Sequence, residues 1–314
     1  MVQCGKSAQM QTKTAIGTLS GVFVDPLVPE LWLGHARVYR NPFWSGDHSF
    51  SHPSPNFDMC SPDGSYLEAA KFLVDVEFKT ETAAMTMESL SDRLESAVLP
   101  LRLGTAGRIL VTFARLGSGP RDVVSAKGVH ANAPLPTGKH PMAALDESSC
   151  EHLSQFAQTL EHLDLTGLKI PLELFSDSFY RSRPVDRGID LLVALEALFS
   201  EGPESISLKV ALRTSCFLAT ESTKRKRIFG IVRDAYKHRN VLVHGTDKRP
   251  KAVAFFEKHD RQLEAIVRQS LCQFVRLLES GTNLEPKNID DFLFDSKLLE
   301  APKTSGIDGF QSVG

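Results

Sequence analysis

The chain has 314 residues and the composition of an ordinary globular protein. Apolar residues make up 42% and charged residues 24%, which excludes wholesale disorder and collagen-like or coiled-coil structure. The net charge of −2 hides an asymmetry, because residues 181–250 contain 14 Lys and Arg against 8 Asp and Glu. We therefore look first in this basic region for an anionic partner such as nucleic acid.

The sequence predicts neither a membrane span nor a secretory leader. Its longest strongly apolar stretch, Ile189–Phe199, is interrupted by Asp190 and Glu196 and is too short to cross a bilayer. The first 21 residues lack the compact apolar segment of a signal peptide. The cysteines are odd in number and widely scattered: Cys4, Cys60, Cys150, Cys216 and Cys272. Without a disulfide framework, the expected compartment is a reducing cytoplasm.

The first 145 residues predict a mixed α/β domain. Alternating apolar residues indicate strands at Phe72–Phe78 and Arg108–Leu116, with Val123–His130 as a candidate partner of the latter. Between them, Thr80–Leu99 has apolar residues at helical spacing, and we expect Pro100 to end that helix. The strands and the helix together give the domain its mixed character.

Two segments rich in turn-forming residues organise the chain. Residues 40–66 abound in Pro, Ser, Gly and Asp, which predicts a long loop. Residues 131–143 are rich in Pro and Gly and are suited to a domain seam. We therefore divide the chain into an N-terminal domain of unknown role, sensor or regulatory, at 1–145 and a helical domain at 146–314.

The second domain is predicted to be all helical. Amphipathic patterns and end signals indicate helices at Glu147–Leu163 with Asp146 as its cap, from Pro184 to the Gly202-Pro203 stop, at Ile206–Ala219, from Thr223 to His244 with Gly245 beyond it, and at Val253–Ser280. Short connections between long helices favour antiparallel neighbours and hence an up-and-down bundle. The predicted fold class is α+β, with this bundle after a mixed α/β domain.

Two charged residues are predicted on inward faces of the bundle. Glu196 lies on the same helical face as Leu192 and Phe199, and Arg239 lies on the apolar face of the fourth helix. An unpaired buried charge is costly, so we expect Glu196 and Arg239 to form a buried ion pair, with Arg213 as a candidate third member. One alternative is that the pair only fixes the register of the bundle.

The opposite face of the fourth helix is basic. Arg233, Lys237, Asn240 and His244 are spaced four, three and four residues apart, which aligns them in one exposed stripe. The stripe combines donors suited to phosphate with an imidazole that titrates near neutral pH. A merely solvated helix face is the alternative interpretation.

Several stretches of this region resemble the Apea-like branch of the HEPN superfamily. The resemblance covers residues 175–245, and its matching stretches are Asp190–Phe199, Ser207–Arg213 and above all Tyr236–Gly245, with a weaker match at Leu99–Gly107. It implies a helical bundle that often dimerises and, in many members, acts as a metal-independent RNase. The superfamily signature is Arg, a polar residue, a short spacer and then His, which Arg239, Asn240 and His244 match.

The resemblance assigns roles to the predicted residues. In RNA cleavage His244 would transfer the proton, Arg239 would neutralise the phosphorane, and Asn240 would orient imidazole or phosphate. Glu196 and Arg213 would support the catalytic residues. Arg233 and Lys237 would bind RNA. On an ideal helix Arg239 and His244 lie 140° apart, so either the helix distorts at its end or two chains share one groove.

The expected partners are RNA and a second copy of the chain, with no cofactor, metal or membrane. The family implies a role in bacterial phage defence or as a toxin. Two alternatives remain: a non-catalytic HEPN module that binds RNA or a protein, and a purely structural dimerisation bundle. A second Arg-to-His spacing, from Arg233 to His238, occurs six residues before the first. The later one is preferred because it ends its helix and precedes Gly245.

Overall fold

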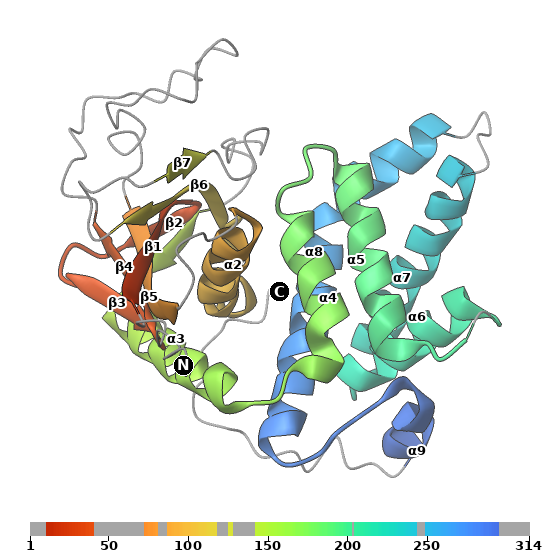
Figure 1. Ribbon diagram of the computed structural model, residues 1–314. Helices are drawn as coiled ribbons and strands as arrows, with labels where there is room; N and C mark the ends of the chain where they lie inside the picture. The colour runs from red at the N-terminus through yellow and green to blue at the C-terminus, as the bar shows by residue number, and fades with distance from the viewer. Residues whose placement is uncertain are drawn as a thin grey trace, which may run out of the picture. The chain divides into compact units, whose positions relative to one another are not determined.

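The computed structural model describes residues 11–40, 72–80, 87–117, 125–127, 142–202, 204–243 and 249–294. The chain is α+β, as the sequence predicted (Figure 1). Its internal contacts define two units, which we call the sheet unit (Met1–Pro100 and Gly107–Ser154) and the helical unit (Leu101–Ala106 and Gln155–Gly314). The chain therefore passes between the units three times: inside a helix after Pro100, back after Ala106, and inside another helix after Ser154.

Within the described residues, the sheet unit contains a six-stranded antiparallel sheet in the order β3-β4-β5-β1-β6-β7. Its strands are β1 (Gln11–Ser20), β3 (Glu30–Leu33), β4 (Ala36–Arg40), β5 (Phe72–Thr80), β6 (Leu110–Gly117) and β7 (Ser125–Lys127). A smaller parallel pair joins β2 (Val22–Val24) to β8 (Ala143–Leu145). The predicted strands at β5 and β6 are confirmed, and so is the pairing of β6 with β7.

Gly21 connects β1 to β2 in a conformation that requires glycine. Its φ is +84°, and a Cβ atom there would lie 1.8 Å from the carbonyl oxygen of Arg108. A side chain at this position would therefore collide with the neighbouring backbone. The chain can thus leave the large sheet and enter the small one within a single residue.

Helix α2 (Met87–Gly104) contradicts the expectation that Pro100 ends it. Proline removes one backbone hydrogen bond and disfavours a helix interior. Here the helix continues for another turn, in which Leu101 and Leu103 are buried. Burial of these side chains offsets the cost of the proline, so tertiary packing overrides the local stop signal. The predicted start of this helix at Thr80 is wrong, because Thr80 is the last residue of β5, paired with Gln11 of β1. Residues 81–86 lie outside the described residues.

Helix α3 (Glu147–His162) begins as predicted. The Ser149 backbone N–H donates to Asp146 Oδ1 at 2.9 Å, so Asp146 caps the helix. Hydrogen bonds from the Ser149 side chain and from its backbone N–H lower the pKa of the Asp146 carboxyl, because they favour the charged form. The predicted loop at 40–66 and most of the predicted seam at 131–143 lie outside the described residues.

The helical unit is formed by consecutive helices that pack on one another. They are α4 (Lys169–Ser178), α5 (Pro184–Phe199), α6 (Ile206–Leu218), α7 (Ser222–Val243), α8 (Arg249–Glu279) and the short α9 (Ile289–Phe294), with 3-10 turns η1 (Thr166–Leu168) and η2 (Pro286–Asn288). Each of the helices α4 to α7 packs on the next, and α8 contacts all four (Figure 1). None of the described helices is long and apolar enough to cross a membrane.

The predicted helices of this unit are close to the observed ones, with three exceptions. Helix α5 starts at Pro184 as predicted but ends at Phe199, three residues before the expected Gly202 stop. Helix α4 was not predicted, because its ten residues include Pro171 and have only a short apolar stripe. Helix α8 starts at Arg249, four residues before the expected Val253, with Pro250 in its first turn.

Helices α5 and α8 approach each other closely around a buried ionic network. A Cβ atom at Gly188 would lie 2.2 Å from Phe256 Cδ1, so glycine allows the contact. Arg187, the residue before Gly188, donates to Asp260 at 2.8 Å and also to Glu264, which accepts from Arg268 as well. All four charged residues of this network are less than 10% exposed: Arg187, Asp260, Glu264 and Arg268. The network fixes the register of the two helices.

Candidate functional site

Helix α7 carries most of the predicted site residues, and its two faces differ as the sequence predicted. Its buried residues are Ile228, Val232, Ala235 and Tyr236. The predicted basic stripe is exposed at Arg233, Lys237 and Asn240. The fourth stripe residue, His244, and Gly245 after it lie outside the described residues. The described part of the candidate site therefore holds the stripe without its imidazole.

The predicted ion pair between α5 and α7 is present. Arg239 Nη1 donates to Glu196 Oε1 at 3.0 Å. We had expected a buried pair, but this pair is only partly buried: the side chain of Arg239 is 29% exposed and that of Glu196 is 21% exposed. Arg239 uses one nitrogen in this contact, and within the described chain its Nε and Nη2 donate to no other group. The guanidinium can therefore hold Glu196 and still offer donors to a ligand at the surface.

Tyr236 closes the inner side of this pair. Its side chain is 3% exposed, and its hydroxyl donates to the Leu192 carbonyl oxygen at 3.5 Å. Burial and the negative charge of Glu196 raise the pKa of Tyr236 well above its usual value, so the phenol stays neutral. Tyr236 is therefore a buried, neutral neighbour of the Glu196–Arg239 pair.

Arg213 does not join this pair, which corrects the sequence prediction. It donates from Nη2 and Nε to the two carboxylate oxygens of Asp290, at 2.6 and 2.7 Å, and from Nη1 to the Phe199 carbonyl oxygen at 2.7 Å. A weaker contact of 3.5 Å reaches Glu201. Helix α6 turns Arg213 toward α9, 77 residues further along the chain. Arg213 therefore anchors α9 and the end of α5, away from Arg239.

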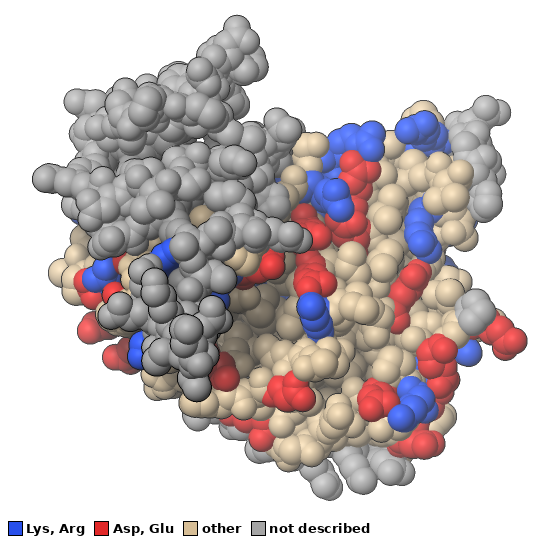
Figure 2. All heavy atoms as spheres, viewed as in Figure 1, with Lys and Arg blue, Asp and Glu red and all other residues tan. Residues whose placement is uncertain are grey.

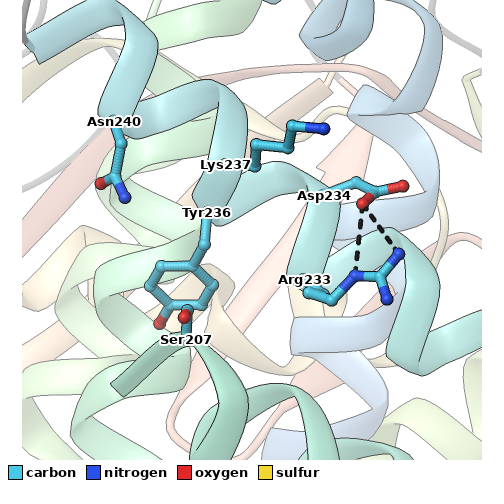
Figure 3. A pocket seen from close by; sticks show the side chains of 6 residues that line it. All are labelled: Ser207, Arg233, Asp234, Tyr236, Lys237 and Asn240. Atoms are coloured by element: carbon cyan, nitrogen blue, oxygen red, sulfur yellow. Dashed lines mark hydrogen bonds and ion pairs between the residues drawn. The ribbon is translucent and has the colours of Figure 1, made fainter. Parts of the chain in front are cut away.

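A pocket of about 370 Å³ lies along α7 where Ser207 of α6 faces it. Three stripe residues line it: Arg233, Lys237 and Asn240. The other lining residues were not predicted as part of the site: Ser207, Asp234 and Tyr236. Figure 3 shows the Tyr236 ring beside Ser207, with the Asn240 amide on the same side of the helix. The pocket therefore joins three of the four stripe residues in one cavity.

The pocket offers several hydrogen-bond donors. Arg233 donates to Asp234 Oδ1 at 3.2 and 3.4 Å, so its charge is partly neutralised by its neighbour (Figure 3). In the described residues, Lys237 and Asn240 have no side-chain partner, and neither has Ser207. An ammonium, an amide and a hydroxyl are all suited to phosphate oxygens. This arrangement favours an anion over a cation or an apolar ligand.

The alternative Arg-to-His spacing does not form a site. The His238 ring stacks on Phe255 of α8, with centroids 4.5 Å apart, and burial lowers the pKa of His238. Five residues separate His238 from Arg233, which places them about 140° apart around the helix. His238 therefore packs between α7 and α8, while Arg233 faces solvent on the stripe.

The sequence analysis missed three pocket residues for different reasons. Tyr236 and Ser207 belong to the stretches that carry the family resemblance, but only the pairing of α6 with α7 brings them together. Asp234 follows Arg233 directly and is one turn before Lys237 and His238, so helical spacing could have found it. It lowers the positive charge of a stripe that the sequence presented as purely basic.

No protein-family model, curated protein or solved structure matches this chain. Among the described residues, no group of three or more His, Cys, Asp and Glu side chains is arranged to hold a metal ion. On the face shown in Figure 2, basic and acidic side chains are interspersed, without one continuous basic surface. The basic stripe on α7 is therefore a local feature rather than part of a strongly positive molecule.

Proposed function

We propose that the helical unit binds RNA on the exposed face of α7 and cleaves it without a metal ion, as a HEPN-type endoribonuclease. The observation that carries the proposal is the pocket in which Lys237, Asn240 and Ser207 offer unused donors. Arg239, which precedes Asn240 in the chain, has two further nitrogens that donate to no other described group. The resemblance at Tyr236–Gly245 adds the expected histidine. A role in phage defence or as a toxin rests on that resemblance alone.

Phosphate recognition follows from the donors. Lys237 supplies a point charge, and Asn240 and Ser207 supply directed hydrogen bonds to the other oxygens. Nucleic-acid affinity depends largely on such contacts to the backbone, which carry no sequence information. We therefore expect binding that weakens with salt and tolerates many sequences.

RNA supplies its own nucleophile, so the protein needs a base, an acid and a charge stabiliser. In this mechanism a histidine takes the proton of the 2′-hydroxyl and the 2′-oxygen attacks phosphorus. The protonated histidine then gives the proton to the 5′-oxygen, which leaves as the bond between phosphorus and that oxygen breaks. The products are a 2′,3′-cyclic phosphate and a 5′-hydroxyl. His244 is the proposed histidine, and Arg239 Nη2 and Asn240 stabilise the charge on the phosphorane.

A homodimer is part of this proposal. Arg239 and His244 are 140° apart on an ideal helix, so one chain presents them to different sides. The Glu196 contact holds Arg239 toward α5, which keeps the two residues apart as long as α7 is regular. In a dimer, His244 of the partner subunit would complete the site next to Arg239.

The test is cleavage of end-labelled RNA with and without a chelator. The proposal expects cleavage that survives the chelator, and a loss of at least about 100-fold in His244→Ala, because general acid–base catalysis contributes that much or more. His162→Ala, an exposed histidine at the end of α3, is the matched control and is expected to keep full activity. Full cleavage by His244→Ala, or cleavage that the chelator stops, would overturn the mechanism.

A second candidate is a non-catalytic helical module that binds RNA or a protein partner. The contact between Arg239 and Glu196 favours it, because an arginine that joins two helices has a structural task already. A gel shift of RNA without cleavage would support this candidate. If the protein neither binds nor cleaves RNA, the remaining interpretation is a structural bundle that dimerises the sheet unit.

A further inference from the structure

The exposed face of α7 extends beyond the predicted stripe toward the start of the helix. Plotted at 3.6 residues per turn, Lys226, Phe229 and Gly230 fall within the same arc of about 100° as Arg233 and Lys237. Lys226 is exposed and Phe229 is half-buried. The face therefore continues for about two turns past the pocket and includes an aromatic ring between basic residues.

Gly230 is in the interior of this helix without a structural reason. After proline, glycine is the least favourable residue in a helix interior. Apart from the neighbouring backbone of its own helix, a Cβ atom at Gly230 would meet no heavy atom of the described residues within 4 Å, and the φ of Gly230 is not positive. By contrast, Gly188 on α5 is required because a Cβ there would collide with Phe256. Packing and backbone geometry thus leave open space at Gly230 that a side chain would fill.

The residues next to Gly230 are suited to a flat aromatic ligand. The Arg233 guanidinium lies 5.5 Å from the centre of the Phe229 ring, as in a cation–π contact. Aromatic rings and guanidinium planes are the groups on which bases of single-stranded nucleic acid stack. The bare backbone at Gly230 lets such a base approach the helix without a clash.

We infer that Phe229, Gly230 and Arg233 form a nucleobase-binding notch, and that the ligand of α7 is single-stranded RNA. The base would occupy the space at Gly230, and its phosphates would reach Lys226 and the pocket at Lys237. These two lysines are separated by about 16 Å along the helix axis, the reach of a short single-stranded segment. Double-stranded RNA keeps its base faces stacked and cannot use the notch. This inference rests on the proposed function.

The test measures binding and stability of Gly230→Ala separately. The probe is a fluorescein-labelled 2′-O-methyl oligouridine, which cannot be cleaved because its 2′-oxygen is blocked. We expect the affinity of Gly230→Ala, read by fluorescence anisotropy, to fall at least fivefold, while its melting temperature stays equal or rises. A structural defect would lower both. Gly167→Ala is the matched control, since a Cβ at Gly167 also meets nothing within 4 Å and the residue is far from α7 in sequence.

A second probe tests the stacking itself. A duplex of the same length is expected to bind more weakly to the wild type, and equally well to wild type and Gly230→Ala. Phe229→Leu keeps an apolar side chain but removes the ring, and we expect it to weaken single-strand binding to a similar degree.

Three results would overturn the inference: unchanged single-strand affinity in Gly230→Ala, an equal loss for single strand and duplex, or no binding of the single strand by the wild type. Cleavage of unmodified RNA by wild type and His244→Ala decides the proposed function separately.

Discussion

Two ionic contacts on the same helix, α5, have opposite surroundings. Near its start, Arg187 is 1% exposed and is held by Asp260 and Glu264 of α8. Nine residues later, Glu196 holds Arg239 of α7, and both side chains are partly exposed. The residue types and the contact distances are similar, so the difference in role comes from burial.

Burial decides what each contact can do. In the deep network, burial lowers the pKa of Arg187, and it lowers that of Arg268 to about 10. Both guanidiniums are held by buried carboxylates, and neither can be reached by a ligand. At the surface, Arg239 keeps two nitrogens without a partner in the described chain. The deep contact therefore serves the architecture, whereas the shallow one is available for chemistry.

The largest effect is expected in the deep network. Glu264→Ala removes the carboxylate that Arg187 and Arg268 share and leaves buried positive charge without compensation. We expect the free energy of unfolding to fall by about 3–5 kcal/mol, measured by urea denaturation. Glu257→Ala, at an exposed position on the same helix, is the control and should change stability by less than about 0.5 kcal/mol. Similar losses in the two variants would show that the network does not act as described.

A smaller loss is expected at the shallow contact. Glu196→Gln keeps the shape of the side chain but removes the charge that Arg239 binds. Partial exposure weakens the contact, so we expect a loss of about 1–2 kcal/mol and a lower melting temperature. Glu173→Gln, which touches only Lys169 at 3.8 Å on the surface, is the matched substitution and should have little effect. An unchanged melting temperature in Glu196→Gln would contradict the pairing.

The most exposed of the three contacts gives the smallest effect and a pH dependence. The guanidinium of Arg213 lowers the pKa of Asp290, whose side chain is 55% exposed. Since the folded-state pKa is depressed, the contact adds stability above the usual value of 3.8 and loses it as the pH falls. Asp290→Asn should cost less than about 1 kcal/mol at pH 7, and its difference in stability from the wild type should shrink as the pH falls below 3.8. A difference that does not shrink as the pH falls would contradict this assignment.

Much of the helical unit could be predicted because its signals are local. Pro184 begins α5, and the three described residues of the stripe on α7, Arg233, Lys237 and Asn240, are exposed as their spacing indicated. The pair of Glu196 with Arg239 was found because each charge lies on an otherwise apolar face. Such features depend on helical periodicity within one element, which a single sequence contains.

Other features depend on contacts between distant segments. The partner of Arg213 is Asp290, and no local pattern links residues 77 positions apart. The continuation of α2 past Pro100 depends on the burial of Leu101, which only the folded chain reveals. The strands β1 to β4 were not predicted, because they are short or mix polar with apolar residues. The pocket likewise needed Ser207 of α6 beside α7.

The central claim is that the exposed face of α7 contacts the RNA backbone, and the salt dependence of binding by Lys237→Ala tests it most directly. Each phosphate contact adds about 0.7 to the slope of log affinity against log salt for a single strand. The account predicts that Lys237→Ala binds an uncleavable RNA several-fold more weakly and loses about 0.7 of that slope. Lys258→Ala, an exposed lysine on α8, should keep both values. Equal affinities and slopes for the two variants would contradict the claim.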